Sequence, residues 1–199
     1  MKILVVADEE STYLWGHYRP GRLAGIDLIL SAGDLKPEYL SFLVTMANRP
    51  LLYIHGNHDG IYEKLPPEGC ECIEDKIVTI NGIRILGLGG ARMYNGGPHQ
   101  FTERQMERRI KKLRWKLQRA GGVDIVLTHS PPAGYGDAED LAHRGFEAFL
   151  PLLDKYQPQY LIHGHVHKNY SAHTFVREVQ YQETTVLNAA GRYVLEISN

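Results

Sequence analysis

Short apolar runs rich in Ile, Val and Leu recur along the chain with few polar interruptions. Continuous hydrophobicity over about four to eight residues is typical of strands that are covered on both faces. Segments with helical periodicity lie between several of these runs. Strands are predicted at residues 2–8, 26–34, 50–56, 123–129 and 159–165, and helices at residues 37–48, 102–120 and 146–157. This succession indicates an α/β domain whose mixed sheets are flanked by helices.

Two further segments have the pattern of antiparallel strands. Residues 76–88 (KIVTINGIRILGL) contain Asn81-Gly82, a dipeptide that favours a tight hairpin turn. Residues 176–197 alternate between apolar and polar side chains. The sequence contains no repeat, low-complexity segment or linker. We therefore expect one domain over residues 1–199, long enough to bury a substantial core.

Composition narrows the classes of function. Apolar residues make up 43% and charged residues 23%, and the formal net charge of -1 gives no global field that would favour nucleic acid or a membrane. The sequence contains no apolar stretch of ~20 residues, and its start lacks the features of a signal peptide, so we expect a cytoplasmic protein without a membrane partner. Cys70 and Cys72 are interpreted as reduced thiols. Ten histidines against two cysteines point to imidazole chemistry.

Each predicted buried strand is followed by residues that can bind a metal. The tails are Asp8-Glu9-Glu10, Gly33-Asp34, Gly56-Asn57-His58-Asp59, Thr128-His129 and Gly164-His165-Val166-His167. Because ligand sites of α/β sheets gather at the carboxyl ends of strands, we expect the tails to converge. One Asp or Asn in such a place would be explained as a turn residue. Five tails of this kind supply enough oxygen and imidazole ligands for two cations.

These residues resemble the motifs of the calcineurin-like metallophosphoesterases. The resemblance rests on Asp8, on GD at 33–34, on GNHD at 56–59, on the histidine of THSPP at 128–132 and on GHVH at 164–167. Their order and spacing match across nearly the whole chain. The run THSPPAGYGD is also similar to the small phosphodiesterase-like branch of that superfamily. The resemblance implies an α/β/β/α sandwich of four layers, with two mixed β-sheets and a two-metal site at one edge.

The resemblance also implies a ligand set. Asp34 would bridge two metal ions. Asp8, the residue two positions beyond it and His167 would hold the first ion. The second ion would be held by Asn57, His129 and His165. The remaining histidines of these segments, His55 and His163, precede the motifs and are expected to be structural.

The implied chemistry is hydrolysis of a phosphate ester. Two cations roughly 3.5–4 Å apart polarise a phosphoryl group and lower the pKa of a bridging water, which yields a hydroxide that attacks phosphorus in line. His58 is the candidate general acid for the leaving oxygen. Asp59 is predicted to orient the His58 imidazole. The alternative for Asp59 is a turn or helix-cap residue.

The first strand departs from the Asp-x-His pattern of the family. Glu10 stands two residues after Asp8, where the family has histidine. If the extended strand continues, Glu10 faces the same side as Asp8 and binds the first metal, whereas Glu9 points away. A carboxylate is a harder ligand than imidazole, so the two divalent or trivalent ions are predicted to be Mn or Fe in preference to Zn. The alternative is a solvated Glu10 beside a weak or empty first site.

Residues 87–97 (GLGGARMYNGG) are rich in glycine, but Arg92 stands where the last glycine of a dinucleotide-binding motif is required. The segment is therefore interpreted as a loop near the site. Arg92 and Asn95 are candidates for contacts to the substrate phosphate. A plain connection without such contacts is the alternative for each residue.

The predicted helix 102–120 has an apolar stripe and a basic face. Met106, Ile110, Leu113 and Leu117 have helical spacing and are expected to face the core. Trp115 lies opposite that stripe, and Arg108, Lys111 and Arg119 share its face. The basic face around Trp115 is a candidate contact for a second subunit or a polyanion, and cation–π stacking within the helix is the alternative.

Three functions are compatible with the sequence. The leading one is a metal-dependent phosphoesterase that acts on phosphodiesters in preference to monoesters. The second is a metal-binding scaffold or interaction protein on the same fold with weakened catalysis. The third is a nuclease-type enzyme that uses the basic helix 102–120 to hold a polyanion.

Overall fold

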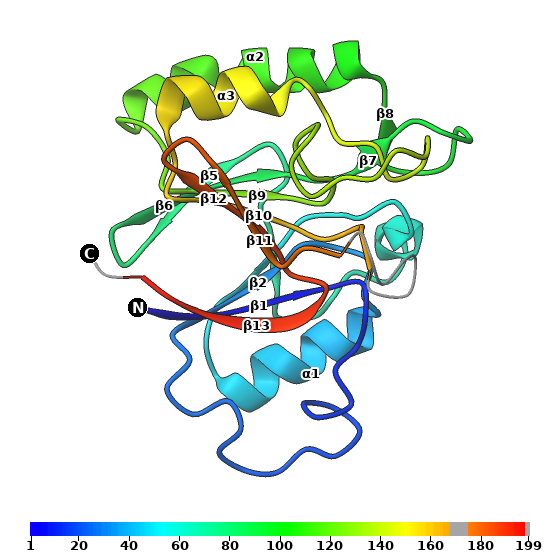
Figure 1. Cartoon of the computed structure of the whole chain (residues 1–199). Helices are drawn as coiled ribbons and strands as arrows, with labels where there is room; N and C mark the ends of the chain where they lie inside the picture. The colour runs from blue at the N-terminus through cyan, green and yellow to red at the C-terminus, as the bar shows by residue number, and fades with distance from the viewer. Residues whose placement is uncertain (168–174, 198–199) are drawn as a thin grey trace.

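The computed structural model describes residues 1–167 and 175–197. Two β-sheets stack face to face, and helices cover the outer face of each sheet (Figure 1). Helix α1 (Pro37–Ala47) covers one sheet, and α2 (Glu103–Arg119) and α3 (Phe149–Tyr156) cover the other. The predicted α/β/β/α sandwich of four layers is confirmed.

The first sheet has five strands in the order β13-β1-β2-β3-β4. Its strands are β1 (Lys2–Ala7), β2 (Leu28–Ser31), β3 (Leu51–Tyr53), β4 (Glu71–Cys72) and β13 (Gly191–Glu196). Strands β1 to β4 pair in parallel, and β13 closes one edge by antiparallel pairing with β1. The strands β1, β2 and β3 therefore end at the same edge of the sheet.

The second sheet has six strands in the order β11-β12-β10-β9-β6-β5. Its strands are β5 (Ile77–Ile80), β6 (Ile83–Leu88), β9 (Ile125–Thr128), β10 (Tyr160–His163), β11 (Glu178–Tyr181) and β12 (Thr184–Asn188). The four central strands are parallel, and β5 and β11 are antiparallel edges. A short ladder, β7 (Ala91–Arg92) with β8 (Gln100–Phe101), and the 3-10 helix η1 (Asp59–Glu63) lie beside the ends of the parallel strands.

The predicted hairpin is present as β5 and β6. Asn81 and Gly82 have φ values of 50° and 86°, the left-handed conformation that a tight two-residue turn requires.

The C-terminal strands are divided between the two sheets. β11 and β12 form an antiparallel pair in the second sheet, whereas β13 returns to β1 in the first. The alternating pattern predicts these strands but not their partition.

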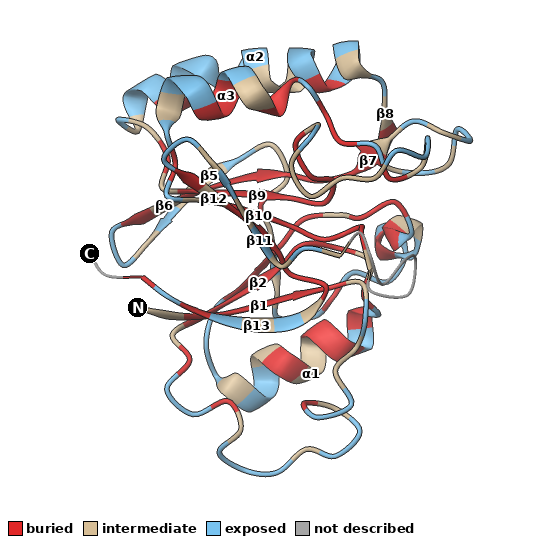
Figure 2. Cartoon of the chain, in the orientation of Figure 1, coloured by how far each residue is buried: buried red, intermediate tan, exposed pale blue. Residues whose placement is uncertain are grey.

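Three apolar cores hold the layers together (Figure 2). The core between the sheets includes Ile3, Leu28, Ile125 and Ile162. The expected apolar stripe of α2 is largely confirmed, since Met106, Leu113 and Leu117 are buried and Ile110 is half-buried. This helix begins with a capping box in which Thr102 and Gln105 satisfy each other's backbone amides. Among the described residues, no helix has both the length and the apolar character needed to cross a membrane.

Candidate metal centre

The predicted ligands follow strands that end at one shared edge. Asp8 follows β1, Asp34 follows β2 and His165 follows β10. Their φ values are 64°, 57° and 70°, a left-handed backbone that is uncommon for residues with side chains. Three such residues at one edge are typical of a functional site, where the surrounding fold offsets the local strain.

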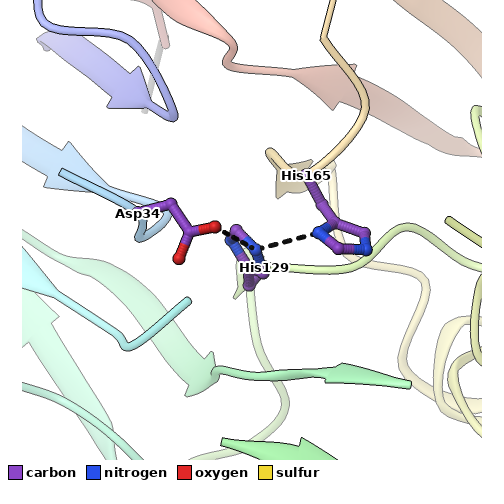
Figure 3. Close-up of side chains that lie close together, drawn as sticks. All are labelled: Asp34, His129 and His165. Carbon is purple, nitrogen blue, oxygen red and sulfur yellow. Dashed lines mark hydrogen bonds and ion pairs between the residues drawn. The ribbon is translucent and has the colours of Figure 1, made fainter. Parts of the chain in front are cut away.

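Three side-chain atoms converge on Nε2 of the His129 ring. This nitrogen lies 3.3 Å from Oδ2 of Asp34 and 3.1 Å from Nδ1 of His165 (Figure 3). It also lies 3.0 Å from Oδ1 of Asn57. The His129 side chain is fully buried, and Asn57 and His165 are also buried. Asp34, His129 and His165 form a cluster whose ligand atoms all lie within 4.8 Å of one another.

Hydrogen bonds on the far side of each ring fix which nitrogen faces the cluster. His129 Nδ1 lies 2.7 Å from the carbonyl oxygen of Ala32, and His165 Nε2 lies 2.7 Å from that of Ala142. A carbonyl only accepts, so these nitrogens carry the hydrogens. In the neutral rings, the lone pairs of His129 Nε2 and His165 Nδ1 then face each other and two side-chain oxygens. A proton on His129 or a bound metal ion satisfies these acceptors, and backbone carbonyls behind both rings are typical of metal-bound histidines.

The electrostatics of the cluster agree with a cation site. Burial by itself would lower the pKa of His129, but the Asp34 carboxylate raises that pKa to about 9. Burial opposes ionisation of Asp34, yet the neighbouring His129 holds the pKa of this carboxyl well below its usual range. Burial lowers the pKa of His165 to about 3, so its ring is a neutral ligand. The cluster thus combines one carboxylate, one amide oxygen and two imidazoles, a donor set that fits a transition metal.

Asp8 and His167 lie beside the cluster without joining it. The Asp8 carboxylate accepts two hydrogen bonds from the backbone N–H of His165, at 2.9 and 3.0 Å. Burial raises the pKa of Asp8 to about 7. The only group of three potential ligands within mutual reach in residues 1–167 and 175–197 is Asp34, His129 and His165. These three residues form a candidate metal site, and the second metal site stays a prediction.

The prediction that Glu10 shares the orientation of Asp8 rests on a wrong premise. Strand β1 ends at Ala7, and the left-handed Asp8 breaks the alternation of side chains before Glu10. The Glu10 carboxylate accepts a hydrogen bond of 3.1 Å from the backbone N–H of Lys36. Glu9 points towards His167 instead, with 4.0 Å between its Oε1 and Nδ1 of that ring. Glu9 is therefore a second candidate for the carboxylate of the first metal site, and ligation by Glu10 stays a prediction.

Alanine variants at the two glutamates are expected to separate these assignments. Glu9→Ala should reduce bound metal from two ions per chain to one, because it removes the carboxylate beside His167. Glu10→Ala should keep both ions, because it removes only a contact to the loop before α1. Metal analysis of the two purified variants, side by side, measures this difference. Loss of one ion from Glu10→Ala alone would restore Glu10 as the ligand.

His58 stands at the open side of the cluster. Its backbone N–H donates to Oδ1 of Asp34 at 2.8 Å, and its ring Nε2 lies 4.0 Å from Oδ2 of the same carboxylate. The His58 side chain is 74% exposed, so it can approach a substrate from solvent. The structure therefore places the candidate general acid next to the predicted bridging ligand.

Asp59 is buried and holds the backbone of the site. Its Oδ2 accepts hydrogen bonds from the N–H of Asp34 at 2.8 Å and from the N–H of Gly56 at 2.7 Å. Burial and the nearby Asp34 raise the pKa of Asp59 to about 6. Within the described part of the chain, no hydrogen bond joins the Asp59 carboxylate to the His58 ring. Its contacts are those of the turn residue considered as the alternative.

In the glycine-rich loop, a residue that was not predicted, Tyr94, contacts the predicted metal ligand Asn57. Tyr94 accepts a hydrogen bond of 3.2 Å from Nδ2 of Asn57, which turns Oδ1 of Asn57 towards His129. Arg92 donates to the carbonyl of Gly145 and lies 3.6 Å from Glu103, and Asn95 bonds within its own turn. Contacts of Arg92 and Asn95 to substrate stay a prediction. Nothing in the sequence of the glycine-rich segment 87–97 distinguishes Tyr94 from its neighbours.

A second unpredicted feature is the loop that follows THSPP. The carbonyl of Ala142 accepts from His165, and the adjacent His143 ring stacks obliquely on His165 with 5.1 Å between ring centres. His143 is buried and its Nδ1 lies 2.9 Å from Oδ1 of Asp140. A histidine amid loop residues gives no signal in a single sequence, because only the fold brings it to the metal ligands.

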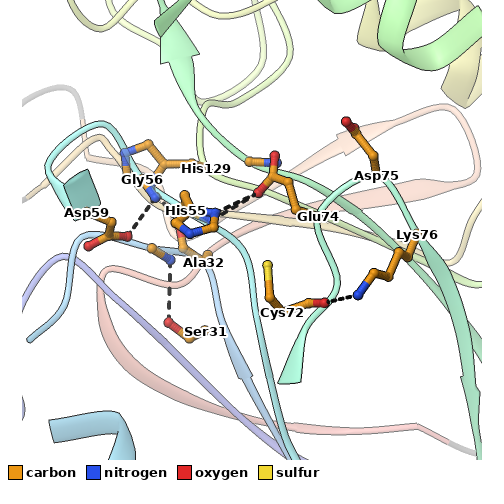
Figure 4. A network of polar contacts seen from close by, with 12 residues as sticks. Ser31, Ala32, His55, Gly56, Asp59, Cys72, Glu74, Asp75, Lys76 and His129 are labelled. Atoms are coloured by element: carbon orange, nitrogen blue, oxygen red, sulfur yellow. Dashed lines mark hydrogen bonds and ion pairs between the residues drawn. The ribbon is translucent and has the colours of Figure 1, made fainter. Parts of the chain in front are cut away.

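A polar network supports the loop that carries Asn57 (Figure 4). Glu74 contacts the backbone N–H of His55 at 3.2 Å and its Nδ1 at 3.3 Å, and it also pairs with Arg109. Burial would lower the pKa of His55, but the Cys72 thiol and the Glu74 carboxylate raise that pKa to about 10.

His163 has the contacts expected of a structural histidine. It is buried, and its Nδ1 faces the carbonyl oxygen of Gly164.

The raised pKa of His55 predicts a loss of stability at alkaline pH. Stabilisation by the charged ring is complete below pH 6.5, its ordinary pKa, and is lost as the pH rises through about 10. We expect the free energy of unfolding to fall across this range, and to fall less steeply in His55→Asn. Glu74→Gln, which removes one of the two groups that raise the pKa, should be intermediate. Urea denaturation at several pH values measures this, and equal slopes in all three proteins would contradict it.

The α/β/β/α sandwich carries a cluster of potential metal ligands at the carboxyl ends of its strands. The chain belongs to the calcineurin-like phosphoesterase family, because its residues 1–169 match the sequence profile of that family. The resemblance seen in the sequence is thereby confirmed.

Relatives and solved structures agree with this family. The chain is 29% identical over 197 residues to UPF0046 protein K07C11.7 of Caenorhabditis elegans, covering 82% of this chain and 62% of that protein. It is 26% identical over 184 residues to the human metallophosphoesterase domain-containing protein 1, covering 72% of this chain and 55% of the relative. The chain thus spans less than two thirds of each.

Two solved structures share the fold. The TT1561 protein of Thermus thermophilus superposes with a TM-score of 0.63 at 18% identity, covering 96% of this chain and 89% of that chain. GAP50 of Plasmodium, described as the anchor in the inner membrane complex, superposes with a TM-score of 0.54 at 14% identity, covering 96% and 71%. At these identities the likeness concerns the fold alone.

Proposed function

We propose that the chain is a metal-dependent phosphoesterase that hydrolyses phosphodiesters at a two-metal site. The observation that carries this proposal is the convergence of acceptors around His129. Two imidazole nitrogens, a carboxylate oxygen and an amide oxygen face one another in a buried place, and each ring has its other nitrogen bonded to a backbone carbonyl. Asp34, Asn57, His129 and His165 would hold one ion, and Asp8, Asp34, His167 and Glu9 the other.

The bound ions would polarise the phosphoryl group and supply hydroxide near neutral pH. The residues of the chain prepare the rest of the site. Asp59 fixes the backbone of Asp34 and Gly56 and so sets the position of the bridging carboxylate. His58 faces solvent at the mouth of the site, where it can donate a proton to the leaving oxygen.

The charge of the first metal site supports a diester substrate and a hard metal. The chain has Glu10 where the family has histidine, so Glu9 would supply a carboxylate to the first site in place of that imidazole, and Asp8 and Asp34 are also carboxylates. The added negative charge disfavours a dianionic monoester more than a monoanionic diester. Carboxylate ligands also favour Mn or Fe over Zn.

Hydrolysis assays after removal of metal test the proposal. Protein stripped with a chelator and reloaded with Mn²⁺ should hydrolyse bis-p-nitrophenyl phosphate faster than p-nitrophenyl phosphate, and Zn²⁺ should restore less activity. Preference for the monoester would contradict the assignment of substrate. Metal binding at full stoichiometry without any hydrolysis would favour the scaffold considered above.

A further inference from the structure

Helix α2 carries positive charge that the protein itself does not neutralise. Its 17 residues include five arginines, three lysines and two glutamates, whereas the chain has a formal net charge of -1. Arg109 pairs with Glu74 and Asp75. The other cations of α2 are all exposed, and in the described residues none of them forms an ion pair: Arg104, Arg108, Lys111, Lys112, Arg114, Lys116 and Arg119.

Part of this charge forms a row with one aromatic side chain in it. At about 100° per residue, the row lies opposite the buried stripe of Met106, Leu113 and Leu117. Its members are Arg104, Arg108, Lys111, Trp115 and Arg119. Neighbours in the row are three or four residues apart, which is about 4.5–6 Å along the helix axis. All five residues are exposed, and α2 belongs to an outer layer of the sandwich (Figure 2).

Trp115 presents a flat apolar surface within the row. The residue is 80% exposed, and in the described part of the chain no cation lies over its ring. A hollow of about 240 Å³ lies beside it. The hollow is lined by Lys111, Arg114, Trp115, Gln118 and Lys155, so an aromatic face, an amide and three cations surround one small space. Stacking within the helix, the alternative for Trp115, is not the arrangement found.

The row leads towards the metal centre. Helix α2 follows β8 directly, and Gln100 of β8 accepts from the backbone N–H of Tyr94 at 3.1 Å. Tyr94 in turn accepts from the side chain of the ligand Asn57. Gln100, four residues before Arg104, is thus linked to the site through Tyr94 by two hydrogen bonds, while Trp115 lies about 16 Å beyond Arg104 along the helix.

We propose that the outer face of α2 binds single-stranded nucleic acid and guides it to the metal centre. Phosphates would contact the cations of the row, and an unpaired base would stack on Trp115, which is how strands are held without sequence preference. The delivery of a diester to the metals rests on the proposed function, whereas the binding does not. A lipid surface is disfavoured, since Trp115 is the only large apolar side chain exposed on the described helices α2 and α3.

Fluorescence anisotropy with a labelled 12-nucleotide oligo-dT tests the binding step. The full chain is used in a chelator, so that no hydrolysis occurs. Trp115→Ala should weaken binding about 5- to 100-fold. Arg108→Glu with Lys111→Glu should weaken it at least tenfold and flatten its salt dependence, because phosphate contacts are lost. Arg19→Glu with Arg49→Glu, the same charge change at exposed positions outside α2, should leave binding unchanged.

A duplex of the same length separates stacking from charge. Trp115→Ala should not weaken duplex binding, because paired bases are not available to the ring, whereas the double charge reversal should. The proposal is overturned if the wild type ignores oligo-dT at low salt, or if the variants bind it like the wild type. It is also overturned if the variants lose only affinity for anionic vesicles or only self-association. Intact binding by a protein that hydrolyses no diester would overturn the proposed function and the delivery step, and would leave the binding of single strands by α2 standing.

Discussion

Asp34→Asn is expected to abolish hydrolysis of phosphodiesters and to remove bound metal. The change keeps the size of the side chain and an oxygen that can accept from His58 N–H, but it removes the charge shared by both predicted metal sites. His129→Ala should have the same effect, because the His129 ring lies at the centre of the acceptor cluster. Metal analysis and hydrolysis of an aryl phosphodiester measure both effects.

His58→Ala is the matched comparison for these variants. It removes an exposed ring that contacts the rim of the site, so the metal content should stay at the wild-type level. The rate should fall by about 10²–10⁴-fold, the typical contribution of a general acid. Loss of metal from His58→Ala would make His58 a ligand and would overturn its assigned role. Full metal content in Asp34→Asn would equally contradict the assignment of the bridging carboxylate.

Gly56→Ala is expected to disrupt the site by a steric conflict alone. A Cβ atom at Gly56 would lie 2.0 Å from Oδ1 of Asp34 and 2.7 Å from its backbone nitrogen. Both atoms belong to a tightly held loop, so the backbone must move. The side chains of the predicted metal ligands Asp34 and Asn57 would move with it. We expect a loss of ~1–3 kcal/mol in the free energy of unfolding and a large loss of metal affinity.

Gly16→Ala is the control for this steric prediction. A Cβ atom at Gly16 would lie 3.5 Å from the carbonyl oxygen of Thr12, an ordinary contact. Its stability and metal affinity should match those of the wild type within ~0.5 kcal/mol. Calorimetric titration with Mn²⁺ and urea denaturation compare the two variants. A Gly56→Ala protein that binds metal like the wild type would show that the close approach of the two loops is not needed.

Periodicity and strand endings predict much of the fold and one metal cluster. The buried runs become the parallel strands of both sheets because continuous apolar sequence suits strands covered on each face. Asp34, Asn57, His129 and His165 meet because parallel strands place their carboxyl ends together. The sequence pattern also predicts the exposed Trp115, since the apolar stripe of α2 fixes which side of the helix faces the core.

Sequence reasoning is weakest where the backbone leaves regular geometry. Strand alternation assigns Glu10 to the metal, but the left-handed Asp8 ends the strand before Glu10, and Glu9 is the glutamate that lies near His167. Asp59 holds backbone amides, because the turn that carries His58 leaves those amides in need of an acceptor. Tyr94 and His143 reach the site through irregular loops, and no periodic signal locates side chains in such segments.

Anomalous diffraction from crystals grown with Mn²⁺ shows directly whether the cluster around His129 binds metal. The structure predicts an anomalous peak between His129 Nε2, His165 Nδ1 and Asp34 Oδ2, because these potential ligand atoms lie within 4.8 Å of one another. A second peak is expected between Asp34, Asp8 and His167. Crystals of a chain with full access to Mn²⁺ that show no peak among these atoms would contradict the account.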